Sequence, residues 1–335
     1  MQNIKPRAIM EYALEMKNYR KVAVLPLIGV HSAAILGVEP KLPFTNAKVM
    51  AKLQEKMAHF YKPDGVFPFM DLTVEAEALG CGLEWGDVPS ISEHLTIDNV
   101  LERLDSEIAE KGRIPVFLEA VSIMSEKLAS DYMVGAYITG PLTLASSIIG
   151  VEKMMKALIR KVDYAQALIE FSEKVCESYA SLLIEHNAEC IMVAEPVGSL
   201  ITSKHFEKYL FGPLKNLVRA IKHKGAWSIL HICGDANHIF ELMGSVGVHA
   251  LSIDDPVDLQ KAFLTARNAS IMGNINTRSM LVSSSFYIEK LCTEAVEKAD
   301  RSRFILSTGC EVPLQTPAKN LKAMIKTARR YNLFT

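Results

Sequence analysis

Three side chains in the sequence suit the binding of a metal ion. His231 and Cys233 occupy positions i and i+2 of the segment 230–234, and on an extended backbone such residues project from the same side. Cys310 lies 77 residues further along, in the segment 307–311, where a glycine again adjoins a cysteine. One imidazole and two thiolates are a good partial ligand set for Zn2+, and they leave a fourth tetrahedral position for a carboxylate, a water or a substrate.

Asp254 is the natural carboxylate for that fourth position, because it directly follows the apolar segment 251–253, and Asp255 is next in line. The spacing also permits another interpretation. Cys233 and Cys310 can be small buried apolar residues, and His231 a core histidine with satisfied hydrogen bonds. Residue types alone leave the two interpretations open.

Two further polar residues are candidates for the same site. Glu195 ends an apolar segment, so it either lines the site or plays a structural role at a strand end. Asn274 is expected in the site, although a loop-closing hydrogen bond is the alternative. His31 and His238 suit solvated or helix-capping positions better than ligand positions. The remaining cysteines are expected to pack in the interior: Cys81, Cys176, Cys190 and Cys292.

Eight short apolar segments alternate with helical patterns, and near-continuous apolar runs are typical of strands buried on both faces. These patterns predict a single (β/α)8 TIM barrel with N-terminal helical additions, as one domain over residues 1–335. His231, Asp254, Asn274 and Cys310 would then each end a different strand, on the face where barrel enzymes carry their chemistry. The predicted strands are 22–28, 65–69, 133–138, 190–194, 227–232, 250–253, 270–275 and 304–306, and the clearest helices are 162–186, 203–224, 286–298 and 318–329.

The composition excludes several classes of function. The 335 residues include 37 Lys and Arg against 38 Asp and Glu, so the net charge of −1 gives no reason to bind nucleic acid or an acidic membrane. Six cysteines are too few for a disulfide scaffold, which favours a reducing cytoplasm. The charge-free run 22–38 is better explained by a strand and a helix start than by a membrane span. The N-terminus is a poor signal peptide. No Gly-rich nucleotide-binding motif is present.

Segments 230–234, 251–254, 273–275 and 309–310 resemble, in that order, motifs of the uroporphyrinogen decarboxylase superfamily. Within it they are similar to the methylcobamide:coenzyme M methyltransferases. The likeness includes 112–115, 139–143 and 194–197, and it extends from about residue 45 to the end. It implies a barrel in which His231, Cys233 and Cys310 bind zinc. Cobalamin-independent methionine synthase, a more distant barrel, similarly supports Asp254 as a displaceable fourth ligand.

The resemblance implies transfer of a methyl group from a methylated corrinoid to a small thiol such as coenzyme M. A metal-bound thiol loses its proton and becomes the nucleophile. The chain lacks a D-x-H-x-x-G cobalamin motif, so the corrinoid (methylcobalamin) is expected on a partner protein. Alternatives are tetrahydrofolate as the methyl acceptor, and a non-catalytic corrinoid-binding protein. Uroporphyrinogen decarboxylase activity is disfavoured, because the segment 26–34 has no arginine to bind a substrate with many carboxylates.

Overall fold

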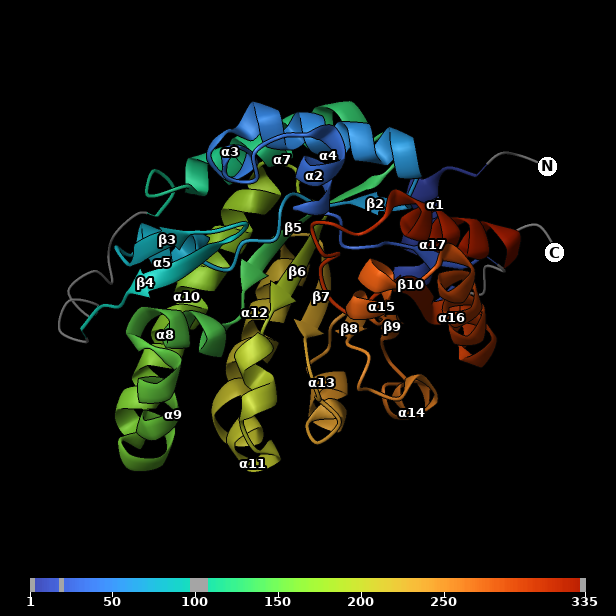
Figure 1. The fold of residues 1–335 in the computed structure, drawn as a ribbon. Helices are drawn as coiled ribbons and strands as arrows, with labels where there is room; N and C mark the ends of the chain where they lie inside the picture. Colours follow the sequence, from blue (N-terminus) through green and yellow to red (C-terminus); the bar gives the residue numbers. More distant parts are fainter. Residues whose placement is uncertain (1–3, 18–20, 97–107, 332–335) are drawn as a thin grey trace.

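The computed structural model describes residues 4–17, 21–96 and 108–331, and its centre is a sheet of eight parallel strands (Figure 1). The strands are hydrogen-bonded in the order β1-β10-β9-β8-β7-β6-β5-β2. The amide of Asp64, just before β2, donates to the carbonyl of Val24 in β1 at 2.9 Å, which brings the two edges together. The result is a nearly closed (β/α)8 barrel, as predicted. The strands are β1 (Ala23–Val24), β2 (Gly65–Val66), β5 (Met133–Thr139), β6 (Cys190–Ala194), β7 (Trp227–Ile232), β8 (Ala250–Ile253), β9 (Ser270–Ile275) and β10 (Phe304–Thr308).

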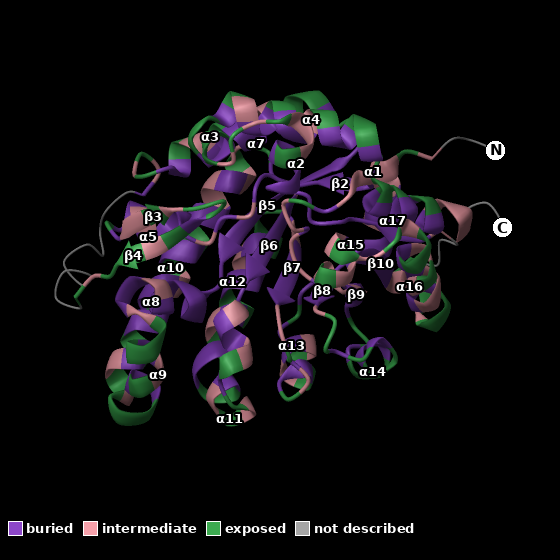
Figure 2. Cartoon of the chain, viewed as in Figure 1, coloured by how far each residue is buried: buried purple, intermediate pink, exposed green. Residues whose placement is uncertain are grey.

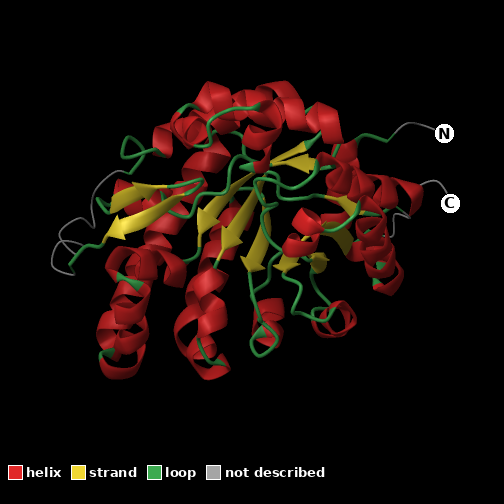
Figure 3. Cartoon of the chain, viewed as in Figure 1, coloured by secondary structure: helices red, strands yellow, loops and turns green. Residues whose placement is uncertain are grey.

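Helices surround these strands and cover the outer face of the barrel (Figure 3). The predicted helices agree with the structure to within two residues, except that 203–224 is divided into α11, a π-helical turn (Phe206–Leu210) and α12. The helices that follow the barrel strands are α4 (Ala47–Tyr61), α7 (Ile114–Leu128), α8 (Pro141–Ile149), α9 (Val151–Arg160), α10 (Val162–Glu185), α11 (Ser203–His205), α12 (Phe211–His223), α13 (Phe240–Ser245), α14 (Leu259–Thr265), α15 (Thr277–Val282), α16 (Ser285–Lys298) and α17 (Ala318–Tyr331).

The barrel lumen is filled by apolar side chains, and the central strands are buried along their length (Figure 2). Phe67 and Tyr137 meet inside it with ring centroids 5.1 Å apart. Both belong to a packed interior cluster with Met192, Ile229 and Ile305. The lumen is thus a core rather than a channel, and it supports the loops at the carboxyl ends of the strands.

Additional N-terminal helices complete the fold, as predicted. Helix α1 (Pro6–Leu14) closes the amino-terminal end of the barrel, where the amide of Arg7 donates to the carbonyl of Asp131 at 2.8 Å and Ser270 donates to Ala13. Helices α2 (His31–Leu36) and α3 (Lys41–Thr45) follow β1. The run 22–38 is therefore a strand followed by a helix. No helix in the described residues is long and apolar enough to cross a membrane.

Two parts of the fold differ from the prediction. Strands β1 and β2 end earlier than the apolar segments 22–28 and 65–69, because Pro26 and Pro68 lack the N–H group that a sheet ladder needs. An antiparallel hairpin, β3 (Gly82–Trp85) with β4 (Pro89–Glu93), was not predicted. It follows α5 (Val74–Ala78), and it lies beside the barrel rather than within it (Figure 1).

Candidate metal centre

The structure brings His231, Cys233 and Cys310 together at the carboxyl-terminal face of the barrel. One ligand atom from each lies within 4.8 Å of the others, although Cys310 is distant in sequence. His231 is the penultimate residue of strand β7, and Cys233 directly follows that strand. Cys310 lies two residues after the end of β10. The convergence arises because parallel strands of one barrel all present their carboxyl ends on the same face.

Ser252 on the neighbouring strand β8 holds the ring of His231. Its hydroxyl lies 3.0 Å from Nδ1 of His231, and both side chains are buried. The other ring nitrogen, Nε2, is buried and has no hydrogen-bond partner in the described residues. A buried nitrogen without a partner costs about 1–3 kcal/mol, so this atom is suited to a metal bond. Ser252 was not identified from the sequence.

The two thiols interact with each other. The hydrogen bond between them lowers the pKa of Cys233 and, together with burial, raises the pKa of Cys310 to about 12. One imidazole nitrogen without a partner and two sulfurs within reach of it fit Zn2+, which prefers nitrogen and sulfur ligands.

Asp254 lies between the two cysteine-bearing loops, outside the three-residue cluster. Its Oδ2 accepts a hydrogen bond from the amide of Gly234 at 2.9 Å, and its Oδ1 accepts from the amide of Asp255 at 2.8 Å. A side chain at Gly309 would place a Cβ only 2.3 Å from Oδ1, so glycine is required for this close approach. Asp255 itself is exposed. Asp254 thus adjoins the site, and each of its oxygens already has one partner.

Asn274 and Glu195 make structural contacts. The side-chain amide of Asn274 donates to the carbonyl of Val257 at 2.8 Å and to that of Asp254 at 3.5 Å, which closes the loop after β8. Glu195 is fully buried at the end of β6 and accepts hydrogen bonds from the amides of Leu142 (2.9 Å) and Thr143 (2.7 Å) at the start of α8. A carboxylate is favourable there, because the amino end of a helix carries partial positive charge.

The remaining histidine and cysteine expectations have mixed outcomes. Cys81, Cys176, Cys190 and Cys292 are buried, as expected of packing residues. His31 lies outside the three-residue cluster, as expected, but it is neither solvated nor a helix cap: its side chain is fully buried at the first residue of α2, and its Nε2 lies 2.8 Å from the hydroxyl of Tyr61. Burial lowers the pKa of His31 to about 4, so this histidine is neutral at pH 7.

Several charged residues near the carboxyl-terminal face were not identified from the sequence. Arg113 binds Asp71 and Glu77, and its NH2 group donates to the hydroxyl of Thr73 at 2.8 Å. Glu311 follows Cys310 and accepts a hydrogen bond from the amide of Val30 at 3.2 Å. Burial raises the pKa of Glu311 to about 8, against the effect of nearby backbone amides.

Glu75 on α5 is another buried carboxyl group in this region. Its Oε1 accepts a hydrogen bond from the amide of Thr139 at 2.7 Å, whereas its Oε2 is buried without a partner in the described residues. Burial raises the pKa of Glu75 from 4.5 to about 7. Between pH 4.5 and about pH 7, the folded chain keeps a proton on Glu75 that the unfolded chain has lost. Glu75 therefore makes the fold less stable as the pH rises through this range.

We therefore expect Glu75→Gln to reduce the loss of stability between pH 5 and pH 8. The amide oxygen still accepts the bond from Thr139, and no buried charge forms at pH 8. Urea unfolding of both proteins at the two pH values measures the effect. Burial also raises the pKa of Glu195 to about 7, so Glu195 still contributes to the pH dependence of stability in the variant. An unchanged pH dependence in Glu75→Gln would contradict the raised pKa.

Ser252→Ala is expected to weaken zinc binding by about 10–100-fold, the usual cost of losing the partner that orients a metal-ligating histidine. Competition with a chromogenic chelator measures the affinity. Ser228→Ala, at another buried serine on a barrel strand, provides the control, because Ser228 contacts His249 rather than His231. Equal zinc affinities in the Ser252 variant and the unaltered chain would show that Ser252 does not orient the ligand.

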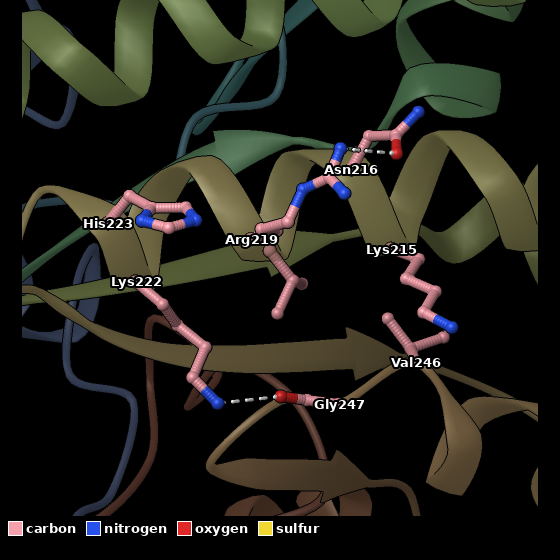
Figure 4. A pocket seen from close by; sticks show the side chains of 8 residues that line it. Lys215, Asn216, Arg219, Lys222, His223, Val246 and Gly247 are labelled. Atoms are coloured by element: carbon pink, nitrogen blue, oxygen red, sulfur yellow. Dashed lines mark hydrogen bonds between the residues drawn. The ribbon is translucent and has the colours of Figure 1, made fainter.

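A separate groove of about 520 Å³ lies on the outside of the barrel between α12 and the residues that precede β8 (Figure 4). Lys222 donates to the carbonyl of Gly247 at 3.2 Å, and Arg219 to the side chain of Asn216 at 3.3 Å. Lys222 precedes β7 and Gly247 precedes β8, so this part of the groove is near the amino ends of the strands. The three candidate ligands are at the opposite ends.

Comparisons with known proteins agree on one family. A family model described as uroporphyrinogen decarboxylase (URO-D) matches residues 14–331. Methylcobamide:CoM methyltransferase MtbA of Methanosarcina mazei is 32% identical over 293 residues, which cover 85% of each chain. Methylcobamide:CoM methyltransferase MtaA of Methanosarcina barkeri is 28% identical over 334 residues, 95% of this chain and 96% of the relative. A solved methyltransferase from Methanosarcina mazei superposes with a TM-score of 0.91 at 26% identity, covering 98% of this chain and 100% of that one.

Proposed function

The chain belongs to the uroporphyrinogen decarboxylase family, and from this premise we propose that it uses zinc to transfer a methyl group from a methylated corrinoid protein to a small thiol, with coenzyme M as the first candidate. The chain is a methyltransferase, since the relatives MtbA and MtaA, which match 85% and 95% of it, are named methylcobamide:CoM methyltransferases. The convergence of His231, Cys233 and Cys310 is the observation that supports the proposal for the thiol acceptor.

The first loop of the barrel supports methyl transfer over decarboxylation. Residues 22–33 are buried and contain no arginine or lysine. The only titratable group there is His31, which burial keeps neutral because its pKa is lowered to about 4. This loop therefore has no cation for a substrate with many carboxylates, which needs cationic partners.

His231, Cys233 and Cys310 would hold the zinc ion, and its positive charge would favour the thiolate form of a bound thiol. Ser252 orients the ring of His231: in the tautomer with the proton on Nδ1, the ring donates to the hydroxyl of Ser252 and the lone pair of Nε2 is free to bind the metal. The site is reached from the carboxyl-terminal face of the barrel, because the lumen below it is packed with apolar side chains. The methylated corrinoid therefore approaches from this face, carried by a separate protein.

Asp254 is the proposed fourth ligand, displaced when the thiol binds, with Asp255 or a water as the alternative. Its position beside both cysteine loops supports this assignment. We expect Asp254→Asn to lower the rate of methyl transfer more than it lowers zinc content, because His231 and two thiolates remain as ligands. Zinc analysis and initial rates on the same samples measure the two effects. Loss of zinc in parallel with activity would mean that Asp254 is essential for holding the metal.

The choice of methyl acceptor is tested with methylcobalamin as donor. Its spectral change on demethylation is followed with coenzyme M, homocysteine or tetrahydrofolate in parallel. Methyl transfer to a thiol, fastest for coenzyme M, is expected. Tetrahydrofolate as the only active acceptor would overturn the proposal and favour the second candidate, a methylcorrinoid:tetrahydrofolate methyltransferase.

A further inference from the structure

We propose that Glu311 is a positioning residue, whose carboxyl group ties the loops after β1 and β2 to the Cys310 segment and thereby directs the sulfur of Cys310 at His231 and Cys233. The inference rests on the proposed function, because it assigns Cys310 a role as a metal ligand. Glu311 itself is outside the three-residue cluster, so its contribution is to geometry and not to metal ligation.

The side chain of Glu311 reaches across to the loop after β1. Its Oε1 accepts a hydrogen bond from the amide of Val30 at 3.2 Å. A Cβ built on Gly29 would lie 1.9 Å from this same oxygen and 3.3 Å from the amide nitrogen of Met70, in the loop after β2. The carboxyl group therefore occupies the space that any other residue at position 29 would fill, and three loops meet around it.

Backbone hydrogen bonds anchor the segment on either side of Cys310. The amide of Gly309 donates to the carbonyl of Ile275 at the end of β9, at 2.8 Å. The amide of Val312 donates to the carbonyl of Leu27 after β1, at 3.0 Å. Glu311 adds a side-chain anchor between these two, in the residue directly after the cysteine.

Measuring the zinc affinity of variants tests the positioning role of Glu311 independently of catalytic activity. We expect Glu311→Ala to weaken zinc binding by about 10–100-fold, as the loss of other contacts behind metal ligands does. In the cobalt-substituted protein, the thiolate-to-cobalt absorption band should weaken, because one of two thiolates is poorly placed. Glu311→Gln should restore most of both signals, since its amide oxygen still accepts the bond from Val30. Gly29→Ala should resemble Glu311→Ala.

Glu177→Ala, at an exposed glutamate of α10, is the matched control and should behave as the unaltered chain. Circular dichroism of every variant confirms the fold, and Gly29→Ala carries the test if Glu311→Ala does not fold. Unchanged zinc affinity and cobalt spectrum in both Glu311→Ala and Gly29→Ala would overturn the proposal. So would a Gln variant as defective as the Ala variant, because the hydrogen bond would then not be the cause.

A trivalent arsenical, which bridges two neighbouring thiols, separates this inference from the proposed function. If the unaltered protein binds no zinc, the proposed function loses its metal, but the pairing of Cys233 with Cys310 can still be measured in the metal-free chain. Weaker arsenical binding in Glu311→Ala than in Glu177→Ala would support the positioning role. Equal binding in these two variants would contradict it.

Discussion

Cys310→Ser is expected to lower methyl transfer to a thiol by more than about 100-fold, while the barrel stays folded. Loss of a residue behind a metal ligand already costs about 10–100-fold, and here a ligand itself is lost. Cys310 is half-buried in a turn beyond β10, outside the packed lumen, so the fold does not depend on it. Initial rates with methylcobalamin and coenzyme M, together with circular dichroism, measure the two effects.

Cys292→Ala is the matched control, because this cysteine is buried on α16 among packing residues. It should retain the full rate at temperatures where the variant is folded. Loss of the circular-dichroism signal in Cys310→Ser would show that Cys310 is structural, and retention of the full rate would remove it from the site.

Arg113→Met is expected to destabilise the fold by about 3–5 kcal/mol, the usual cost of removing one partner from a buried ion pair. Only 7% of the Arg113 side chain is exposed, and its partner Asp71 is fully buried. The variant leaves the charge of Asp71 in the interior with the hydroxyl and amide of Thr73 as its remaining partners. Urea unfolding near neutral pH measures the change in the free energy of unfolding.

Lys127→Met removes a cation from a pair with Glu55 that is 46% and 30% exposed, and it should cost no more than about 1 kcal/mol. A cost for Arg113→Met as small as this control would contradict the structural role of the buried pair. It would also mean that the loop after β2 keeps its place without Arg113.

The sequence predicts the barrel well because buried parallel strands have a strong local signal. Each of the eight apolar segments contains a strand, and the short break after each strand places the next residues on one face. Once the barrel is inferred, His231, Cys233 and Cys310 converge without further information. Asp254 and Asn274 also end their strands where expected, although spacing alone says nothing of their hydrogen bonds.

What the sequence conceals is which polar residues become buried and what they contact. Glu311 and Val30 are 281 positions apart, and their hydrogen bond depends on how the loops after the neighbouring strands β1 and β10 meet. In the sequence Ser252 looks like any other serine on a strand. Its contact with His231 becomes evident only when β7 and β8 are placed side by side. His31 was misjudged for the same reason, because its burial comes from Tyr61 and the segment near Leu314.

Glu195 shows how one residue type supports two interpretations. A carboxylate at a strand end fits both a reactive site and the amino end of a helix. The structure places it at the start of α8, where the amides of Leu142 and Thr143 donate to it. Only the position of α8 relative to β6, which local patterns do not contain, reveals this contact.

We propose that His231, Cys233 and Cys310 hold a zinc ion on which methyl transfer to a thiol depends. The most direct test is the rate of methylcobalamin demethylation by coenzyme M in the protein as purified, after removal of its metal, and after return of one equivalent of zinc. We expect the rate to be lost with the metal and to return with about one zinc per chain. An undiminished rate in the metal-free protein, or no transfer to any thiol by the zinc-loaded protein, would contradict it.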